Sequence, residues 1–112
     1  MSMEIETEKT GKHALIKLSG RLDNNTSPNL RQAVLALFTH GSSNNLTVDF
    51  AEVSFIDTAG LATLLEILVT AKEKCARLTL SGLKENVRYL IDVNGLTGFF
   101  QIVSSAEERS HS

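Results

Sequence analysis

An acid and a hydroxyl residue stand side by side at Asp57 and Thr58, inside the stretch SFIDTAGLATLLE. The stretch is apolar before this pair and takes up the spacing of an apolar helix after Gly60, which places the pair at the start of a helix. Either side chain can cap that helix by accepting a hydrogen bond from a free N–H group. Thr58 can also accept a phosphate, because a helix N-terminus favours added negative charge. Capping does not explain why two such residues stand side by side, nor does it explain Gly60. A glycine at this position would let another chain approach the backbone closely.

Other residues with catalytic potential are scattered along the chain. There is no glycine-rich nucleotide-binding motif and no G-x-S-x-G motif. His13, His40 and His111 stand in a predicted strand, a helix end and a tail, and none has a second ligand at metal-binding spacing. Cys75 is the single cysteine, so it cannot form an internal disulfide. The sequence therefore predicts no catalytic residue, no metal site and no cofactor.

A phosphoaspartate receiver domain has a similar length and would use Asp49, at the end of a strand, as its acceptor. Such a domain also needs an acidic pair after its first strand and a lysine late in the chain. Here one acid, Asp23, follows LIKLSG, and no lysine follows Lys84. The predicted opening hairpin does not fit a receiver either, so we set this alternative aside.

Size and charge narrow the class of protein. A chain of 112 residues is expected to form a single domain, 1–112, with a core at about 4–106 and a tail at 107–112. The formal net charge of −2 argues against nucleic acid or an anionic membrane as the main partner. No apolar run reaches the length of a membrane span, and MSMEIETEK lacks the apolar segment of a signal peptide. A cytoplasmic protein is expected.

The apolar pattern predicts the elements that position Asp57 and Thr58. Alternation predicts a β-hairpin of 4–9 with 13–19, followed by a loop at 20–26. Further strands are predicted at 46–50, with Leu46, Val48 and Phe50 on one face, at 76–81 and in FFQIVSS. Helices are predicted from Thr26 or Ser27 to THGSSNN, at about 59–74, and over 83–95, where Asn94–Gly95 is a natural C-terminal stop. This order indicates an α/β domain with three main helices and a mixed, mostly parallel sheet of four to five strands.

The helix predicted at 59–74 carries more apolar residues than one face needs. The stripe expected to face the sheet is Leu61, Leu64, Leu65 and Leu68. Further apolar surface lies elsewhere, at Ala62, Ile67, Val69 and Ala71. This surface fits either a partner or dimer face, or contacts with neighbouring elements of the same domain.

Three segments resemble the STAS domain family, and among its members the bacterial anti-sigma factor antagonists. They are SGRLDNNT, VDFAEVSFIDTAGLATLL and LSGLKENVRYLIDVNGL, and the match to which they belong spans about residues 4–106. The matching positions are Gly20, Leu22, Asp23 and Thr26; Asp49, Phe50, Val53, Phe55, Ile56, Asp57, Thr58, Gly60 and Leu61; and Gly95 and Leu96.

The resemblance implies a binding protein that regulates transcription and has no catalysis of its own. Its partner would be an anti-sigma factor that is also a serine/threonine kinase, which the unphosphorylated chain binds. The kinase would phosphorylate Thr58 and so end binding, and a phosphatase would reset the system. By the same resemblance, Asp23 lies close to Thr58. The partner surface that the resemblance implies comprises Asp23, Asp57, Thr58, Gly60 and Leu61.

Two departures from the family pattern affect this expectation. The acceptor is usually serine, whereas threonine occurs in related stress-signalling complexes and in STAS subunits of lipid-transport ABC systems. The alternative function is therefore that of an accessory subunit that binds the ATPase of a lipid-transport ABC system. The family usually also ends in a helix, whereas AEERSHS leaves room for one helical turn at most. A monomer and a dimer are both compatible with the sequence.

Overall fold

Within the part of the chain that the structure describes, five strands form one sheet in which their order follows the chain, β1-β2-β3-β4-β5. The computed structural model describes residues 3–39 and 44–104. The strands are β1 (Glu4–Thr10), β2 (His13–Leu22), β3 (Asn45–Ile56), β4 (Arg77–Ser81) and β5 (Gln101–Val103). β1 and β2 pair antiparallel, and the other neighbours pair parallel. The predicted α/β fold with an opening hairpin is confirmed.

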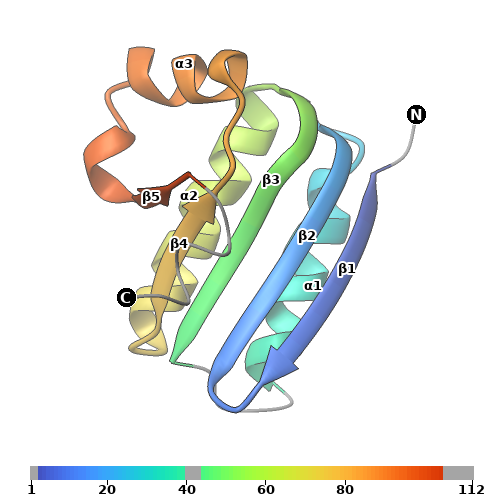
Figure 1. Cartoon of the computed structure of the whole chain (residues 1–112), viewed down its shortest axis with the longest axis vertical. Coiled ribbons are helices and arrows are strands. Elements are labelled where there is room, and N and C mark those ends of the chain that lie inside the picture. Colours follow the sequence, from blue (N-terminus) through green and yellow to red (C-terminus); the bar gives the residue numbers. More distant parts are fainter. Residues whose placement is uncertain (1–2, 40–43, 105–112) are drawn as a thin grey trace.

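The three predicted helices are α1 (Ser27–Thr39), α2 (Thr58–Glu73) and α3 (Glu85–Val93). Right-handed crossovers place successive helices on one face of a sheet when each new parallel strand is added on the same side. Figure 1 shows this arrangement, with α1 and α2 behind the sheet and α3 at its upper end. The start of α2 therefore lies at the edge of the sheet where the parallel strands end.

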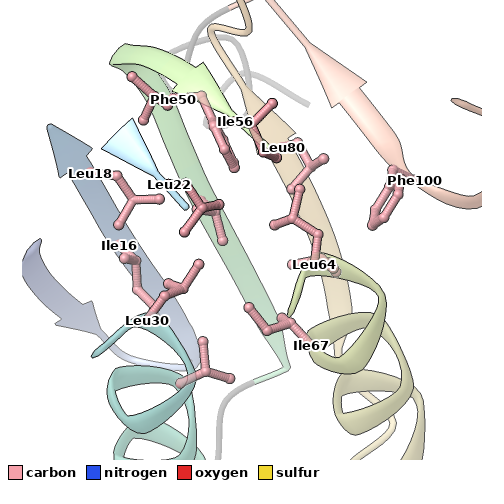
Figure 2. Packing of buried hydrophobic residues seen from close by; sticks show 14 of the residues in the cluster. Ile16, Leu18, Leu22, Leu30, Phe50, Ile56, Leu64, Ile67, Leu80 and Phe100 are labelled. Atoms are coloured by element: carbon pink, nitrogen blue, oxygen red, sulfur yellow. The ribbon is translucent and has the colours of Figure 1, made fainter. Parts of the chain in front are cut away.

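The core lies between the sheet and the helices α1 and α2. The predicted common face of Leu46, Val48 and Phe50 in β3 is confirmed, because all three side chains are buried. Leu30 of α1 and Leu64 of α2 are fully buried in the same cluster (Figure 2). This packing fixes the position of α2 and hence of Thr58 at its start.

The buried side of α2 differs from the predicted stripe. The buried residues are Gly60, Leu61, Thr63, Leu64, Ile67 and Ala71. Leu65 and Leu68, which were expected to face the sheet, are only half-buried. The helix is turned relative to the prediction because it packs on the strands and on α1 at the same time. The outward apolar surface is correspondingly smaller, with Ala62 and Val69 exposed.

β2 continues through residues 20–22, which the sequence predicts as a loop. Its register against β3 shifts between Lys17 and Ser19 and again between Gly20 and Arg21, and such irregularities bend a strand without ending it. Gly20 has a φ of 110°, a conformation that glycine adopts without strain. The glycine therefore marks a bend inside the strand, and the loop begins at Asp23.

Some predicted features lie outside the described residues. They are the C-terminal boundary of the first helix near residues 40–43, the last residue of FFQIVSS, the tail at 107–112, and two of the three histidines, His40 and His111. The predicted stop of the third helix at Asn94 and Gly95 is confirmed, because α3 ends at Val93 and Asn94 is its C-cap.

Candidate functional site

Asp57 joins the start of α2 to the loop that follows β2. It is the N-cap of α2, and its Oδ1 accepts a hydrogen bond from the Gly60 N–H at 2.8 Å. Its Oδ2 accepts a second hydrogen bond from the Asn24 N–H at 3.2 Å. The Asp57 N–H donates to the Leu22 carbonyl at 3.2 Å. Capping is therefore confirmed for Asp57, and the same carboxylate also holds the two loops together.

Thr58 is the first residue of α2, and it is exposed. Asp57 already supplies the cap, so the Thr58 hydroxyl is not needed for that purpose. In the part of the chain that the structure describes, no hydrogen bond from this hydroxyl is found. Thr58 thus presents a free hydroxyl on backbone that the contacts of Asp57 hold in place.

Asp23 is held mainly by its own loop. Its Oδ1 accepts hydrogen bonds from the N–H groups of Asn25 at 3.0 Å and Thr26 at 3.1 Å. Thr26 is buried, and its hydroxyl donates a hydrogen bond to the Arg21 carbonyl at 2.7 Å. The same hydroxyl accepts a hydrogen bond from the Asp23 N–H at 2.9 Å. These bonds are those of a turn aspartate. The loop that they shape lies directly against Asp57 through the Asn24 N–H.

The Asp23 carboxylate is favoured in its charged form. Partial desolvation alone would raise its pKa. The hydrogen bonds from the Thr26 and Asn25 backbone and from the Thr26 hydroxyl, together with the positive charge of Arg21, outweigh that effect and hold the pKa of Asp23 below its ordinary value. The nearest atoms of the Arg21–Asp23 ion pair, Nε and Oδ2, are 3.8 Å apart. Asp23 therefore carries a stable negative charge in the loop whose Asn24 N–H bonds Asp57.

Gly60 and Leu61 belong to the core rather than to the exposed surface of the site. A Cβ at Gly60 would lie 2.5 Å from the Leu22 carbonyl oxygen and 2.8 Å from Cγ1 of Ile56. Glycine is needed here because the chain's own backbone approaches closely. Leu61 is 5% exposed. Both residues shape the site from beneath and offer almost no surface to a second protein.

Contacts outside the predicted set also build the site. The Asn86 Nδ2 donates to the Ser54 carbonyl at 2.9 Å. On the neighbouring strands, the Arg21 guanidinium lies 3.9 Å from the centroid of the Phe55 ring. The arginine–aromatic pair could have been found only with the register of β2 and β3 known. Asn86 lies on a different element and left no signal in the pattern.

The site consists of the exposed Thr58 hydroxyl next to Asp57, whose carboxylate bonds the loop that contains Asp23. Its chemistry suits modification of the hydroxyl and recognition by a second protein. Among residues 3–39 and 44–104, no group of three His, Cys, Asp or Glu side chains is placed to hold a metal ion. Within the same residues, no helix is both long and apolar enough to cross a membrane.

Comparison with known proteins identifies the family. Residues 5–104 match the family model described as "Mlab, STAS domain". The chain is 28% identical over 102 residues to the anti-sigma-B factor antagonist of Listeria monocytogenes, an alignment that covers 91% of this chain and 88% of that protein.

Two solved structures share the fold. An anti-sigma factor antagonist from Mycobacterium paratuberculosis has a TM-score of 0.84 at 22% identity, covering 95% of this chain and 89% of that one. The Bacillus cell fate determinant SpoIIAA in its phosphorylated form has a TM-score of 0.76 at 21% identity, covering 96% and 97%. With a family model that spans nearly all described residues and a fold that agrees with it, the chain belongs to the STAS domain family.

Proposed function

We propose that this protein is an anti-sigma factor antagonist whose binding is switched by phosphorylation of Thr58. In its unphosphorylated form it binds an anti-sigma factor that is also a serine/threonine kinase, and it thereby regulates transcription without being an enzyme. The observation that carries the proposal is the exposed Thr58 hydroxyl, free of intramolecular bonds, at the start of a capped helix. The anti-sigma-B factor antagonist among the similar proteins supports the same role.

The folded chain tolerates a phosphate at Thr58. The added charge is about −1.5 to −2 at neutral pH. The dipole and free N–H groups of the α2 N-terminus offset part of the repulsion from Asp57 and Asp23, by about 0.3–1 kcal/mol. Because Thr58 is exposed, water solvates the rest of the charge. Phosphorylation is therefore expected to leave the fold intact.

A bound partner does not tolerate that phosphate. An interface over Thr58 would have to remove water from the dianion and place it beside two carboxylates. An unpaired charge buried in this way costs several kcal/mol. Each 1.4 kcal/mol corresponds to about a factor of ten in affinity, so a loss of about 100-fold or more is expected.

The proposed contact surface follows from the exposure of the predicted residues. Thr58 is exposed and Asp23 and Asp57 are partly exposed, so these three can touch a partner directly. Gly60 and Leu61 act through the shape that they give to the start of α2. Val69, 56% exposed, lies about three turns further along the same helix and is not part of this surface.

The test compares the two phosphorylation states of one protein. The chain is incubated with its cognate kinase and ATP, the modified residue is mapped by mass spectrometry, and binding of both forms to the kinase is measured by titration calorimetry. Thr58 is expected to carry the phosphate, and the modified form to bind about 100-fold more weakly or worse. Thr58→Ala and the isosteric Thr58→Val should bind and stay bound in the presence of ATP, whereas Thr58→Glu should bind poorly.

Two results would contradict the proposal. Phosphate at Ser54, which is also exposed, with none at Thr58 would remove the acceptor from its proposed position. Equal affinity of the two forms would exclude the switch. The second result would favour the constitutive accessory subunit of a lipid-transport ABC system, in which Thr58 is a contact only.

A further inference from the structure

β3 continues beyond the end of its pairing with β4. The pairing runs from Asn45 opposite Arg77 to Asp49 opposite Ser81, whereas β3 extends to Ile56. Along the rest of β3, side chains near the start of α3 take over as hydrogen-bond donors. The Lys84 Nζ donates to the Ala51 carbonyl at 2.6 Å, and the Asn86 Nδ2 donates to the Ser54 carbonyl at 2.9 Å.

Ser54 connects three elements. Its carbonyl accepts from Asn86 of α3, and its hydroxyl donates to the Gly20 carbonyl of β2 at 3.3 Å. Ser54 precedes Asp57 by three residues, and Gly20 precedes Asp23 by three residues. The chain of contacts from Asn86 through Ser54 to Gly20 therefore ties α3 to both strands just before each enters the site.

We propose that Asn86 is a positioning residue for the Thr58 site. By holding the Ser54 carbonyl, it fixes the end of β3 relative to β2, and with it the two loops that Asp57 bonds together. The inference rests on the proposed function in so far as Thr58 is taken to be the modified residue.

Two features make the position of the end of β3 depend on the Asn86 side chain. The register of β2 against β3 shifts between Gly20 and Arg21, so Ser54 falls between the pairs Gly20–Val53 and Arg21–Phe55, and two residue pairs of β2 and β3 follow it. The Asn86 side chain is exposed, and water can replace it at the Ser54 carbonyl when it is removed. Loss of Asn86 is therefore expected to loosen the site without unfolding the domain.

The test uses two asparagines of the same helix region. Asn86→Ala removes the contact with Ser54. Asn94→Ala is the matched control, because the Asn94 Nδ2 donates to the Leu90 carbonyl at 2.8 Å at the other end of α3. The first measurement is amide hydrogen exchange of the Gly60 and Asn24 N–H groups, which both bond Asp57. Exchange is expected to be about fivefold faster in Asn86→Ala and unchanged in the control.

The second measurement is the kinetics of phosphorylation by the cognate kinase. Asn86→Ala is expected to lower the rate at saturating protein about fivefold and to leave the half-saturating concentration unchanged. Asn86→Gln, which keeps the amide donor, should restore part of that rate. Equal melting temperatures of the two alanine variants would show that helix stability is not the cause.

Three outcomes would overturn the inference. The first is that Asn86→Ala shows the same exchange and kinetics as the wild type, and the second is that Asn94→Ala shows the same effects as Asn86→Ala. The third is that Asn86→Ala raises the half-saturating concentration and leaves exchange unchanged, which would make Asn86 a direct contact of the kinase. If the kinase leaves Thr58 of the wild-type protein unmodified, the proposed function fails instead. The exchange measurement then still decides whether Asn86 holds the two loops.

Discussion

Replacing Gly60 with alanine tests how tightly the start of α2 is packed against β2. The added Cβ would lie 2.5 Å from the Leu22 carbonyl oxygen and 2.8 Å from Cγ1 of Ile56. The first of these atoms belongs to the backbone and cannot turn away as a side chain can. Either α2 or the end of β2 must therefore shift, at the point where the Asp57 N–H bonds the Leu22 carbonyl.

The size of the effect is the difference between two terms. Overpacking costs about 1–3 kcal/mol, and contact with a rigid backbone atom places Gly60→Ala near the upper end. Alanine returns up to about 1 kcal/mol through its higher helix propensity. The net loss of unfolding free energy is about 2 kcal/mol. For a domain of this size, that loss lowers the melting temperature by about 8 °C.

The assay is thermal unfolding followed by circular dichroism, with Gly98→Ala as the matched control. No atom lies within 4 Å of a Cβ built at Gly98, so the control is expected to stay within about 0.5 kcal/mol of the wild type. A Gly60→Ala variant as stable as the Gly98→Ala variant would refute the close approach.

Three further substitutions test the site and its helix. Cys75 has a φ of 57°, in the left-handed region just beyond α2, so Cys75→Gly should raise the unfolding free energy by about 1 kcal/mol in urea titrations. Asp57→Ala removes the acceptor for the Gly60 and Asn24 N–H groups and should lower it by about 1–2 kcal/mol in the same assay. Because the pKa of Asp23 is lowered in the folded chain, its carboxylate stabilises the fold above about pH 4, and this stabilisation is lost as the pH falls through the lowered pKa. Asp23→Asn should therefore be less stable than the wild type at pH 7, with a difference that shrinks in acid.

Each of these expectations has a contrary result. An unchanged or lower stability of Cys75→Gly would mean that the left-handed backbone at this position carries no strain. If Asp57→Ala were as stable as the wild type, the cap that Asp57 forms would not stabilise α2. A difference between Asp23→Asn and the wild type that grows in acid would reverse the sign expected from the lowered pKa.

The sequence was sufficient for the order of elements because their signals are local. Alternation in β2 and β3, the Asp57 cap and the Asn94–Gly95 stop are each contained in a few neighbouring residues. The orientation of α2 was not predictable in the same way. Leucines and other apolar residues occupy most of its sides, so several stripes satisfy the helical period, and the positions of α1 and the strands select among them.

The sequence identifies which residues belong to the candidate site, whereas their roles follow only from the hydrogen bonds and packing contacts in the structure. Asp57 was correctly expected as a possible cap, but its bond to Asn24 uses a backbone N–H and so leaves no trace in residue type. The contact of Asn86 with Ser54 joins two residues that lie 32 positions apart in the sequence. The sequence suggests that Gly60 lets another chain approach the backbone, whereas the backbone that approaches it is that of Leu22 in the same chain.

The order of the strands bears on how the chain folds. Because each strand lies beside its predecessor, the colours of Figure 1 run in sequence across the sheet, from β1 in blue to β5 in red. No strand has to be inserted between two that have already paired, and each pairing closes only the loop or helix just synthesised. The sheet can therefore grow from the N-terminus as the chain leaves the ribosome, with β5 as the last strand to add. Residues 57–60 then reach their final contacts with Leu22 and Asn24 before the last strand has emerged.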